Sequence, residues 1–277
     1  MQLELPAKTL DLAAPRVMGV LNRTPDSFSD AGAFQNLESA LQHALRMVDE
    51  GADIIDVGGE STRPGSAGVS VQEELDRVVP LVERLVSVSE IPISIDTSKP
   101  EVMRAAVAAG AAMINDVYAL RRPGALEAAR ACAVPVCLMH MQGEPRTMQK
   151  SPAYEDVVAE VRQFLEARVQ ACVSAGIPRQ KLVIDPGFGF GKTLAHNLGL
   201  LRDLAVLTSL EVPILVGLSR KSMIGALLGN APVTDRLQGS VVAAVIAVLH
   251  GARLVRTHDV LPTVQALRIA AAICVHE

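Results

Sequence analysis

The amino-acid sequence predicts an α/β protein built as a closed (β/α)8 barrel, the TIM barrel, in a single domain over residues 1–277. Eight short apolar runs alternate with longer amphipathic stretches, and no linker or low-complexity segment interrupts the series. The length is also close to the roughly 250 residues typical of this fold. The alternative is a doubly wound open sheet, which usually has fewer strands and a glycine-rich turn after the first. Here the first run leads into the sequence NRTPD at residues 22–26, which favours the barrel.

Several of the apolar runs show no polar alternation, as expected of parallel strands that are covered on both faces. The predicted strands are Arg16–Leu21, Ile54–Val57, Ile91–Ile95, Met113–Val117, Val134–Met139, Leu182–Ile184, Ile214–Gly217 and Leu254–Val255.

The stretches between these runs carry apolar residues at helical spacing. The predicted helices are Leu37–Glu50, Val71–Val88, Glu101–Ala109, Ala125–Ala131, Tyr154–Ala175, His196–Leu207, Thr234–His250 and Val260–Ala272. Four of them are followed by a glycine, as the carboxyl end of a helix favours: Gly51, Gly110, Gly176 and Gly251.

Composition excludes several classes of protein. The net charge is only −4, with both signs spread along the chain, and 3% of the residues are aromatic, so we expect no nucleic-acid partner. The longest apolar run, Val241–Leu249, is far short of the ~20 residues that span a bilayer, so we expect no membrane contact. Residues 1–15 lack the apolar stretch of a signal peptide.

The four cysteines form no C-x-x-C pair, and Cys137 and Cys274 sit in apolar runs. This pattern is typical of buried thiols in a reducing compartment, and we expect a cytoplasmic protein.

Polar residues follow the predicted strands, and barrel enzymes carry their chemistry at that end of the strands. The residues are Asn22, Asp56, Asp96, Asn115, Asp116, His140, Asp185, Ser219 to Lys221 and Arg256 to His258. Any one of them can be a helix cap or a satisfied structural group. Their recurrence at all eight strands predicts an active site at this end of the barrel.

The loops after strands seven and eight often bind phosphate in such barrels. Here they supply Arg220, Lys221, Arg256 and His258, whose donors suit phosphate oxygens. The sequence therefore predicts an anion site for a phosphate or diphosphate.

Asp96, Asn115 and Asp185 end non-adjacent strands and are expected to converge on the barrel axis. Carboxylates that accept from ring N–H and amino groups, with an amide that both donates and accepts, suit a flat nitrogen heterocycle.

Two other signals are set aside. Residues 187–193, GFGFGKT, imitate a phosphate-binding P-loop, but that motif needs glycine where the chain has Pro186. Met139, His140 and Met141 resemble soft-metal ligands, but no second His or Cys cluster lies nearby in the sequence, so we expect Met139 to pack against the ligand.

These segments together resemble the dihydropteroate synthase family over some 240 residues. Residues 17–30, VMGVLNRTPDSFSD, and 51–66, GADIIDVGGESTRPGS, look like its first two signatures. The strings SIDTS at 94–98, ND at 115–116, DPGFGFGK at 185–192, SRKS at 219–222 and RTHD at 256–259 follow in the family's order.

The resemblance implies that 6-hydroxymethyl-7,8-dihydropterin diphosphate condenses with p-aminobenzoate to give 7,8-dihydropteroate and diphosphate. It assigns the pterin to Asp96, Asn115, Val117, Met139, Asp185, Phe190, Gly217 and Lys221. It assigns the diphosphate to Asn22, Thr62, Arg63, Arg256 and His258, with Mg2+ at Asn22. It assigns p-aminobenzoate to Phe28, Thr62, Arg63, Pro64, Phe190, Ser219 and Lys221. The implied catalytic residues are Asp96, Lys221, Arg256 and His258.

In this family the C–O bond breaks first, and the arylamine then attacks a delocalised pterin cation. The resemblance also implies a homodimer and a target of sulfonamides. Residues 22–36 and 58–70 are expected to order over the diphosphate and build the second-substrate pocket. Arg23 replaces a small aliphatic residue common in relatives. Glu60 and Asp56 are expected to support the second of these loops.

Two rival interpretations remain. A pterin-dependent methyltransferase would share Asp96, Asn115 and Asp185 but would not need the anion pocket. A pterin-binding paralogue without activity would have lost site residues, all of which are present here.

Overall fold

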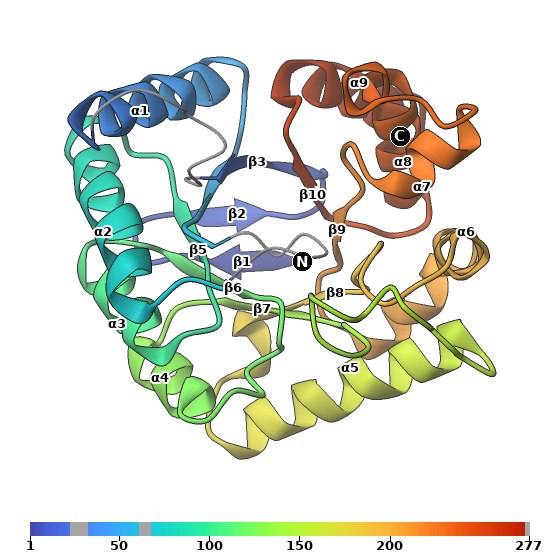
Figure 1. Ribbon diagram of the computed structural model, residues 1–277, viewed down its shortest axis with the longest axis horizontal. Coiled ribbons are helices and arrows are strands. Elements are labelled where there is room, and N and C mark those ends of the chain that lie inside the picture. Colours follow the sequence, from blue (N-terminus) through green and yellow to red (C-terminus); the bar gives the residue numbers. More distant parts are fainter. Residues whose placement is uncertain (23–32, 61–67, 275–277) are drawn as a thin grey trace.

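A computed structural model of the protein describes residues 1–22, 33–60 and 68–274. Eight parallel strands form one sheet in the order β8-β7-β6-β5-β4-β3-β10-β9, and a parallel bridge between Ile184 and Ile214 closes the ring (Figure 1). The strands are β3 (Arg16–Asn22), β4 (Ile54–Gly58), β5 (Ile93–Asp96), β6 (Met113–Asp116), β7 (Val136–Met139), β8 (Leu182–Asp185), β9 (Leu215–Gly217) and β10 (Leu254–Thr257). The predicted (β/α)8 barrel is confirmed, and its strands lie at the predicted runs.

Helices surround the ring in Figure 1. They are α1 (Ala33–Asp49), α2 (Val71–Val88), α3 (Pro100–Ala108), α4 (Ala125–Cys132), α5 (Val157–Ser174), α6 (Leu194–Arg202), α7 (Ser222–Leu227), α8 (Leu237–Leu249) and α9 (Val260–Cys274). The predicted helix 196–207 is wrong at its end, because α6 stops at Arg202 and a 3-10 helix, Leu204–Leu210, follows. The predicted helix 234–250 begins late, at Leu237, after a 3-10 turn at Val233–Asp235.

The sequence dictates where several helices begin and end. The Ser70 hydroxyl accepts from the Glu73 N–H at 3.1 Å and caps the amino end of α2. The four predicted carboxyl-end glycines have φ between 93° and 111°, the left-handed region that a side chain disfavours. The main core lies between the helices and the outer face of the sheet, where Ile55, Val57 and Leu85 are fully buried.

A two-stranded hairpin lies across the ring in Figure 1. Its strands β1 (Gln2–Glu4) and β2 (Thr9–Asp11) are antiparallel, and each buries only its central leucine. A second apolar cluster joins this hairpin to the amino ends of the barrel strands. It consists of Leu3, Leu5, Leu10, Leu12, Met18, Ile54, Ala112, Met113, Cys137, Val183, Leu215 and Leu254. The hairpin, which the sequence did not predict, therefore closes the amino end of the barrel.

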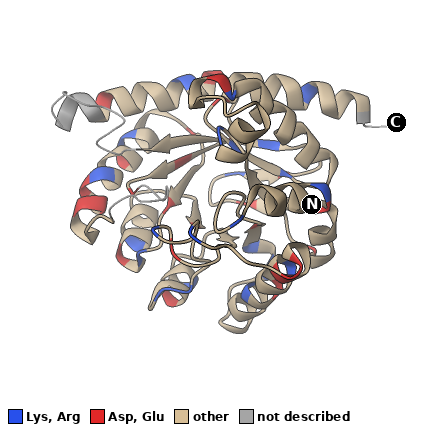
Figure 2. Ribbon diagram, turned by 45° about the vertical axis from the view of Figure 1, so that its right-hand side comes forward, with Lys and Arg blue, Asp and Glu red and all other residues tan. Residues whose placement is uncertain are grey.

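Basic and acidic residues are interspersed over the helices in Figure 2, as the sequence predicts. Within the residues that the structure describes, none of the helices is long and apolar enough to cross a bilayer.

Candidate active site

A pocket lies at the carboxyl ends of the barrel strands. It is lined by Asp96, Asn115, Val117, Met139, Asp185, Gly187, Phe188, Phe190, Gly217, Lys221 and Arg256. The eight residues that the sequence analysis assigned to the pterin are all among them. Their convergence follows from the closed sheet, which brings the ends of β5, β6, β8 and β9 to one point.

Arg256 joins two buried carboxylates at the centre of the barrel. Its Nε donates to Oδ2 of Asp56 at 2.6 Å, and its Nη2 donates to Oδ2 of Asp96 at 2.8 Å. The amide of Asn115 donates to the same Asp56 oxygen at 3.1 Å. Burial alone would lower the pKa of Arg256, but the charges of Asp56 and Asp96 outweigh burial and raise it, so Arg256 stays charged.

These contacts correct one expectation about Asp56. From its place in the sequence, Asp56 was expected to support the loop that follows β4. The structure instead buries it completely inside the barrel, where it accepts from Arg256 and Asn115. Glu60 does contact that loop, since its Oε1 accepts from the Val69 N–H at 3.4 Å.

The two pocket aspartates have shifted pKa values. Burial raises the pKa of Asp96 to about 7; Arg256 opposes this shift and Asp56 adds to it. Burial also raises the pKa of Asp185, although its Oδ1 accepts from the Gly187 N–H at 2.7 Å, which lowers it. The Asp96 carboxyl group can therefore gain or lose a proton near neutral pH when a ligand changes its surroundings.

Lys221 directly precedes α7, and its Nζ lies 4.2 Å from the centre of the Phe190 ring, in a cation–π contact. Burial lowers the pKa of Lys221 to about 8, and the charge of Asp185 opposes that shift. The ammonium thus contacts an aromatic ring and feels the negative charge of Asp185 and Asp96. This arrangement suits a flat ligand that presents both a ring face and acceptor atoms.

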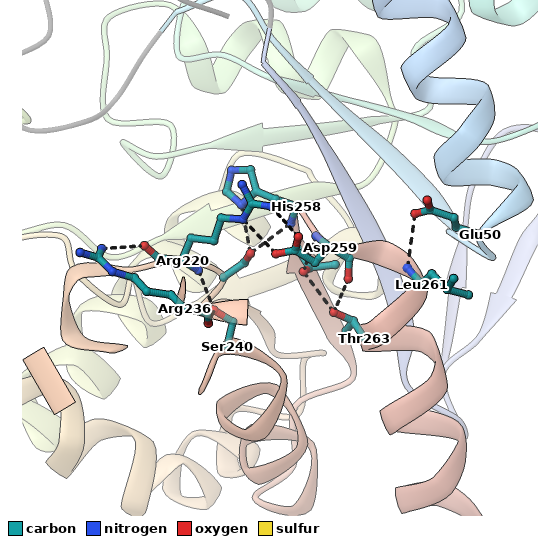
Figure 3. Close-up of polar contacts among 10 residues, drawn as sticks. Glu50, Arg220, Arg236, Ser240, His258, Asp259, Leu261 and Thr263 are labelled. Carbon is teal, nitrogen blue, oxygen red and sulfur yellow. Dashed lines mark hydrogen bonds and ion pairs between the residues drawn. The ribbon is translucent and has the colours of Figure 1, made fainter. Parts of the chain in front are cut away.

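The remaining residues after β9 and β10 form a second group, drawn in part in Figure 3. The Ser219 hydroxyl accepts from the His258 backbone N–H at 3.2 Å and lies 3.1 Å from His258 Nδ1. Arg220 donates from Nε and Nη2 to the two Asp259 oxygens, at 3.0 and 2.5 Å. The structure therefore pairs Arg220 with Asp259 outside the pocket lining, which does include the predicted anion-site residues Lys221 and Arg256.

Asn22 ends β3 opposite Gly58. A methyl group placed on Gly58 would lie 3.4 Å from Asn22 Oδ1 and 3.7 Å from Asp96 Oδ2, so both oxygens face the same space. Asp56 Oδ1 is buried without a hydrogen-bond partner. These are hard oxygen donors of the kind that Mg2+ accepts, and Mg2+ usually needs only one or two protein ligands beside water and phosphate. Among the described residues there is no cluster of three or more His, Cys, Asp or Glu side chains for a metal. The donor set fits Mg2+ held jointly with a phosphorylated ligand.

Four predicted site residues lie outside the described part of the chain: Phe28, Thr62, Arg63 and Pro64. Sequence reasoning missed Gly187 and Phe188 as lining residues. The string GFGFGK following Asp185 was the available signal, because a loop directly after a strand-end aspartate must lie beside it.

The chain matches known proteins along nearly its whole length. The family described as "Pterin binding enzyme" matches residues 18–258. The dihydropteroate synthase of Escherichia coli K12 is 54% identical over 272 residues, which cover 98% of this chain and 96% of that one. The Haemophilus influenzae enzyme of the same name is 53% identical and covers 95% of each chain.

Solved structures agree with this match. The Yersinia pestis dihydropteroate synthase with a sulfonamide drug complex superposes with a TM-score of 0.94 at 55% identity and covers 99% of both chains. The Xanthomonas albilineans enzyme in complex with 7,8-dihydropteroate superposes with a TM-score of 0.92 at 51% identity and covers 100% of both chains. The chain therefore belongs to the pterin-binding enzymes and, among them, to the dihydropteroate synthase family.

Proposed function

We propose that this protein is a transferase that condenses 6-hydroxymethyl-7,8-dihydropterin diphosphate with p-aminobenzoate to give 7,8-dihydropteroate and diphosphate. The observation that carries the proposal is the single pocket in which Asp96, Asn115 and Asp185 lie with Lys221 and Arg256. Full-length relatives that share half of its residues support the same reaction. A Xanthomonas albilineans relative at 53% identity is described with 4-aminobenzoic acid, which supports the second substrate.

The pterin ring takes the deep part of the pocket. Asp96 and Asp185 accept from its ring N–H and amino groups, and Asn115 both donates and accepts. Asn115 is held for this task by Asp56, because its amide donates to the same oxygen that binds Arg256. Val117, Met139, Gly217 and Phe190 contribute the apolar walls of the slot.

The diphosphate lies above the pterin, near Arg256, His258 and Asn22, with Thr62 and Arg63 from the loop after β4. Ion pairs with Asp56 and Asp96 hold the Arg256 guanidinium in place before the ligand binds. A preorganised cation that does not have to reorient at the moment of reaction lowers the barrier most effectively. Asn22 would hold Mg2+, which supplies further charge neutralisation of the leaving diphosphate.

The reaction begins with departure of the diphosphate, as the C–O bond to the pterin methylene breaks. Positive charge then spreads over the pterin, and the ionised Asp96 and Asp185 carboxylates stabilise it electrostatically. The amine of p-aminobenzoate attacks the methylene carbon and afterwards releases a proton. Bond breaking needs no nucleophile from the protein. The roles of Asp96, Lys221, Arg256 and His258 are binding and charge stabilisation.

p-Aminobenzoate lies at the mouth of the pocket. We assign it to Phe28, Thr62, Arg63, Pro64, Phe190, Ser219 and Lys221. Lys221 stacks on Phe190, so one cation and one ring form a shared wall between the two substrate positions. A carboxylate-bearing aromatic ring fits such a wall.

We also propose that residues 1–277 act as one domain and that two copies form a homodimer in the cytoplasm. Several large apolar side chains remain exposed on α8 and α9: Val242, Ile246, Leu249, Leu261, Ile269 and Ile273. Exposed apolar surface gathered on two adjacent helices is typical of a protein interface. The free thiols of Cys132, Cys137 and Cys172 agree with a reducing compartment.

The deciding assay measures diphosphate release from the pterin diphosphate, with and without p-aminobenzoate, in the presence of Mg2+. We expect release that depends on p-aminobenzoate, together with formation of dihydropteroate. If added p-aminobenzoate yields no new product, the proposed reaction is wrong. Retention of the pterin diphosphate without turnover would then identify a binding paralogue, and transfer of a methyl group would identify the methyltransferase alternative.

A further inference from the structure

Two segments that the sequence analysis set aside meet behind the pocket. His140 follows β7, between Met139 and Met141, and Lys192 ends the glycine-rich run after β8. They are 52 residues apart in the sequence, but Lys192 Nζ lies 2.8 Å from His140 Nδ1. Neither residue lines the pocket itself.

Lys192 is almost fully buried, with 3% of its surface exposed, yet every donor of its ammonium group has an acceptor. Beside His140, its Nζ donates to the carbonyl oxygens of Gly187 at 2.9 Å and Phe190 at 3.2 Å. Three acceptors match the three donors of a lysine ammonium group. Gly187 and Phe190 are both lining residues of the pocket, so Lys192 holds the backbone of its wall from behind.

The same wall packs directly on the segment after β7. Gly187 has a φ of +69°, and a methyl group placed there would lie 1.9 Å from the His140 carbonyl oxygen. Gly191 has a φ of +62°, and a methyl group there would lie 2.4 Å from the Gln142 carbonyl oxygen. No side chain fits at either glycine, so the two backbones touch and Lys192 crosses between them.

Other contacts fix the outer side of this run. The Asn197 side chain accepts from the Gly189 N–H at 2.8 Å, and the Tyr154 hydroxyl donates to the Gly191 carbonyl at 2.8 Å. Lys192 reaches both the wall and the segment after β7 with one charged group. The cation that stacks on Phe190 from the front is Lys221. Phe190 thus contacts two cations, Lys221 through its ring and Lys192 through its backbone carbonyl.

We propose that Lys192, through its contact with His140, is a positioning residue that holds the wall formed by residues 187–190 at the correct place for the pterin ring. This inference rests on the proposed function, because it concerns the pocket that holds the pterin. Lys192 touches no substrate. It acts on affinity by fixing where Gly187 and Phe190 lie before the ligand arrives, which reduces the ordering cost of binding.

The electrostatics of the pair agree with this geometry. Burial, together with the charges of Lys192 and Arg121, lowers the pKa of His140 to about 2, so the ring is neutral. A neutral imidazole offers one acceptor nitrogen, and Nδ1 faces the ammonium, so the proton belongs on Nε2. Burial lowers the pKa of Lys192 to about 7, opposed by the charge of Asp185 and assisted by that of Lys221.

The first experiment compares Lys192→Met with Lys181→Met in the full-length protein. Lys181 is the matched control, because it precedes β8 at the opposite end of the barrel and also donates to a backbone carbonyl, that of Ala133. We expect Lys192→Met to raise both the dissociation constant and the KM for the pterin diphosphate by about tenfold, because the lost hydrogen bonds of the ammonium group affect the ligand only through the wall. The KM for p-aminobenzoate and kcat should change less than about threefold, and Lys181→Met should match the wild type in all four values.

A double variant tests whether Lys192 acts through His140. His140→Phe removes the acceptor and keeps a ring beside Phe164, whose ring centre lies 4.9 Å away. We expect the double variant with Lys192→Met to bind the pterin diphosphate no more weakly than Lys192→Met alone. Both changes remove the same contact, the one between Lys192 and His140, so the second change has nothing further to remove. Fully additive losses would overturn the coupling, and wild-type pterin binding by Lys192→Met would overturn the proposal.

A measurement on the unmodified protein covers the case in which Lys192→Met does not fold. Nitrogen-15 NMR of the histidine rings should show His140 with its proton on Nε2 and without titration near pH 6.5, where an exposed histidine titrates. A His140 that titrates normally, or that carries its proton on Nδ1, overturns the contact. Failure of the proposed function is distinct, since it would appear as a wild-type protein that forms no product.

Discussion

The two ends of the barrel are built from the same strands but differ in chemistry. At the amino end, Leu3 and Leu10 of the hairpin pack on the first residues of the strands, such as Ile54 and Leu254, and all four are at most 2% exposed. At the carboxyl end the strands carry charged and amide side chains that line the pocket, such as Asp96, Asn115, Asp185 and Arg256. The change takes two or three residues, as from Ile54 to Asp56 in β4.

The contrast teaches how the barrel separates stability from binding. Apolar side chains at the amino end gain free energy when they leave water, whereas buried charges at the carboxyl end cost free energy unless each is paired. Arg256, Asp56 and Asp96 meet that requirement by pairing with one another. Changes at the carboxyl end should therefore affect the ligand, and changes at the amino end should affect folding.

The largest effect is expected from Arg256→Ala, which removes a cation from the anion site and leaves Asp56 and Asp96 without their shared partner. We expect affinity for the pterin diphosphate to fall on the order of 1000-fold, the range for truncating one member of a buried charge pair. Isothermal titration calorimetry measures this loss. Lys221→Ala should also weaken binding severely, and near-wild-type affinity in both variants would refute the anion site.

The matching change at the other end is Leu10→Ala. Leu10 is 2% exposed inside the apolar cluster, so its truncation should lower the free energy of unfolding by about 3 kcal/mol. Urea denaturation followed by circular dichroism measures this value. The KM values of both substrates should stay within about twofold, because Leu10 lies at the end opposite the pocket. A large change in KM would contradict the separation of the two ends.

A smaller effect on the ligand is expected from Asp56→Asn, which keeps the size of the side chain and removes its charge. We expect kcat/KM for the pterin diphosphate to fall about tenfold, since Arg256 loses one charged partner. Asp56 contributes to the raised pKa of Asp96, so its neutralisation should lower that pKa from its value of about 7. The ionised form of Asp96 then persists to lower pH, and the acid limb of the kcat/KM profile should move down. A profile that stays in place or moves up would show that Asp56 does not act on Asp96.

The smallest effect is expected from Asp53→Asn, three residues earlier and at the amino end. Asp53 forms a partly exposed ion pair with Arg16 at 3.2 Å and accepts from the Val17 N–H at 2.9 Å. We expect a loss of about 1 kcal/mol in the free energy of unfolding and no change in kcat/KM. Thermal unfolding and the diphosphate-release assay test both values. Impaired catalysis in Asp53→Asn would contradict the separation of stability and binding between the two ends of the barrel.

The sequence predicted the strands and the residues of the pocket for one physical reason. A parallel strand buried on both faces is continuously apolar, so the first polar residue after it marks the carboxyl end, as Asp96 and Asp185 do. The closed sheet then brings those ends together.

Other features could not be predicted because they depend on how loops pack. The strands β1 and β2 have three residues each, too few to show an alternating pattern. Helix α7 has six residues, too few to show a helical period in the sequence. The contact between Lys192 and His140 joins two loops, and its only signal in the sequence was a pair of motifs that did not fit their usual roles.

The closed amino end also has a consequence for the order of events in a turnover. Within the described residues, Leu3, Leu10 and their neighbours close the amino end of the barrel. Ligands therefore enter and leave at the carboxyl end. The molecule that lies deepest must then arrive first and depart last. A pterin that lies on Asp96 and Asp185 would be covered by the ligand that binds above it, so the geometry imposes an order of binding. Substrate binding should therefore be ordered, and the aromatic amine should react only after the pterin has bound.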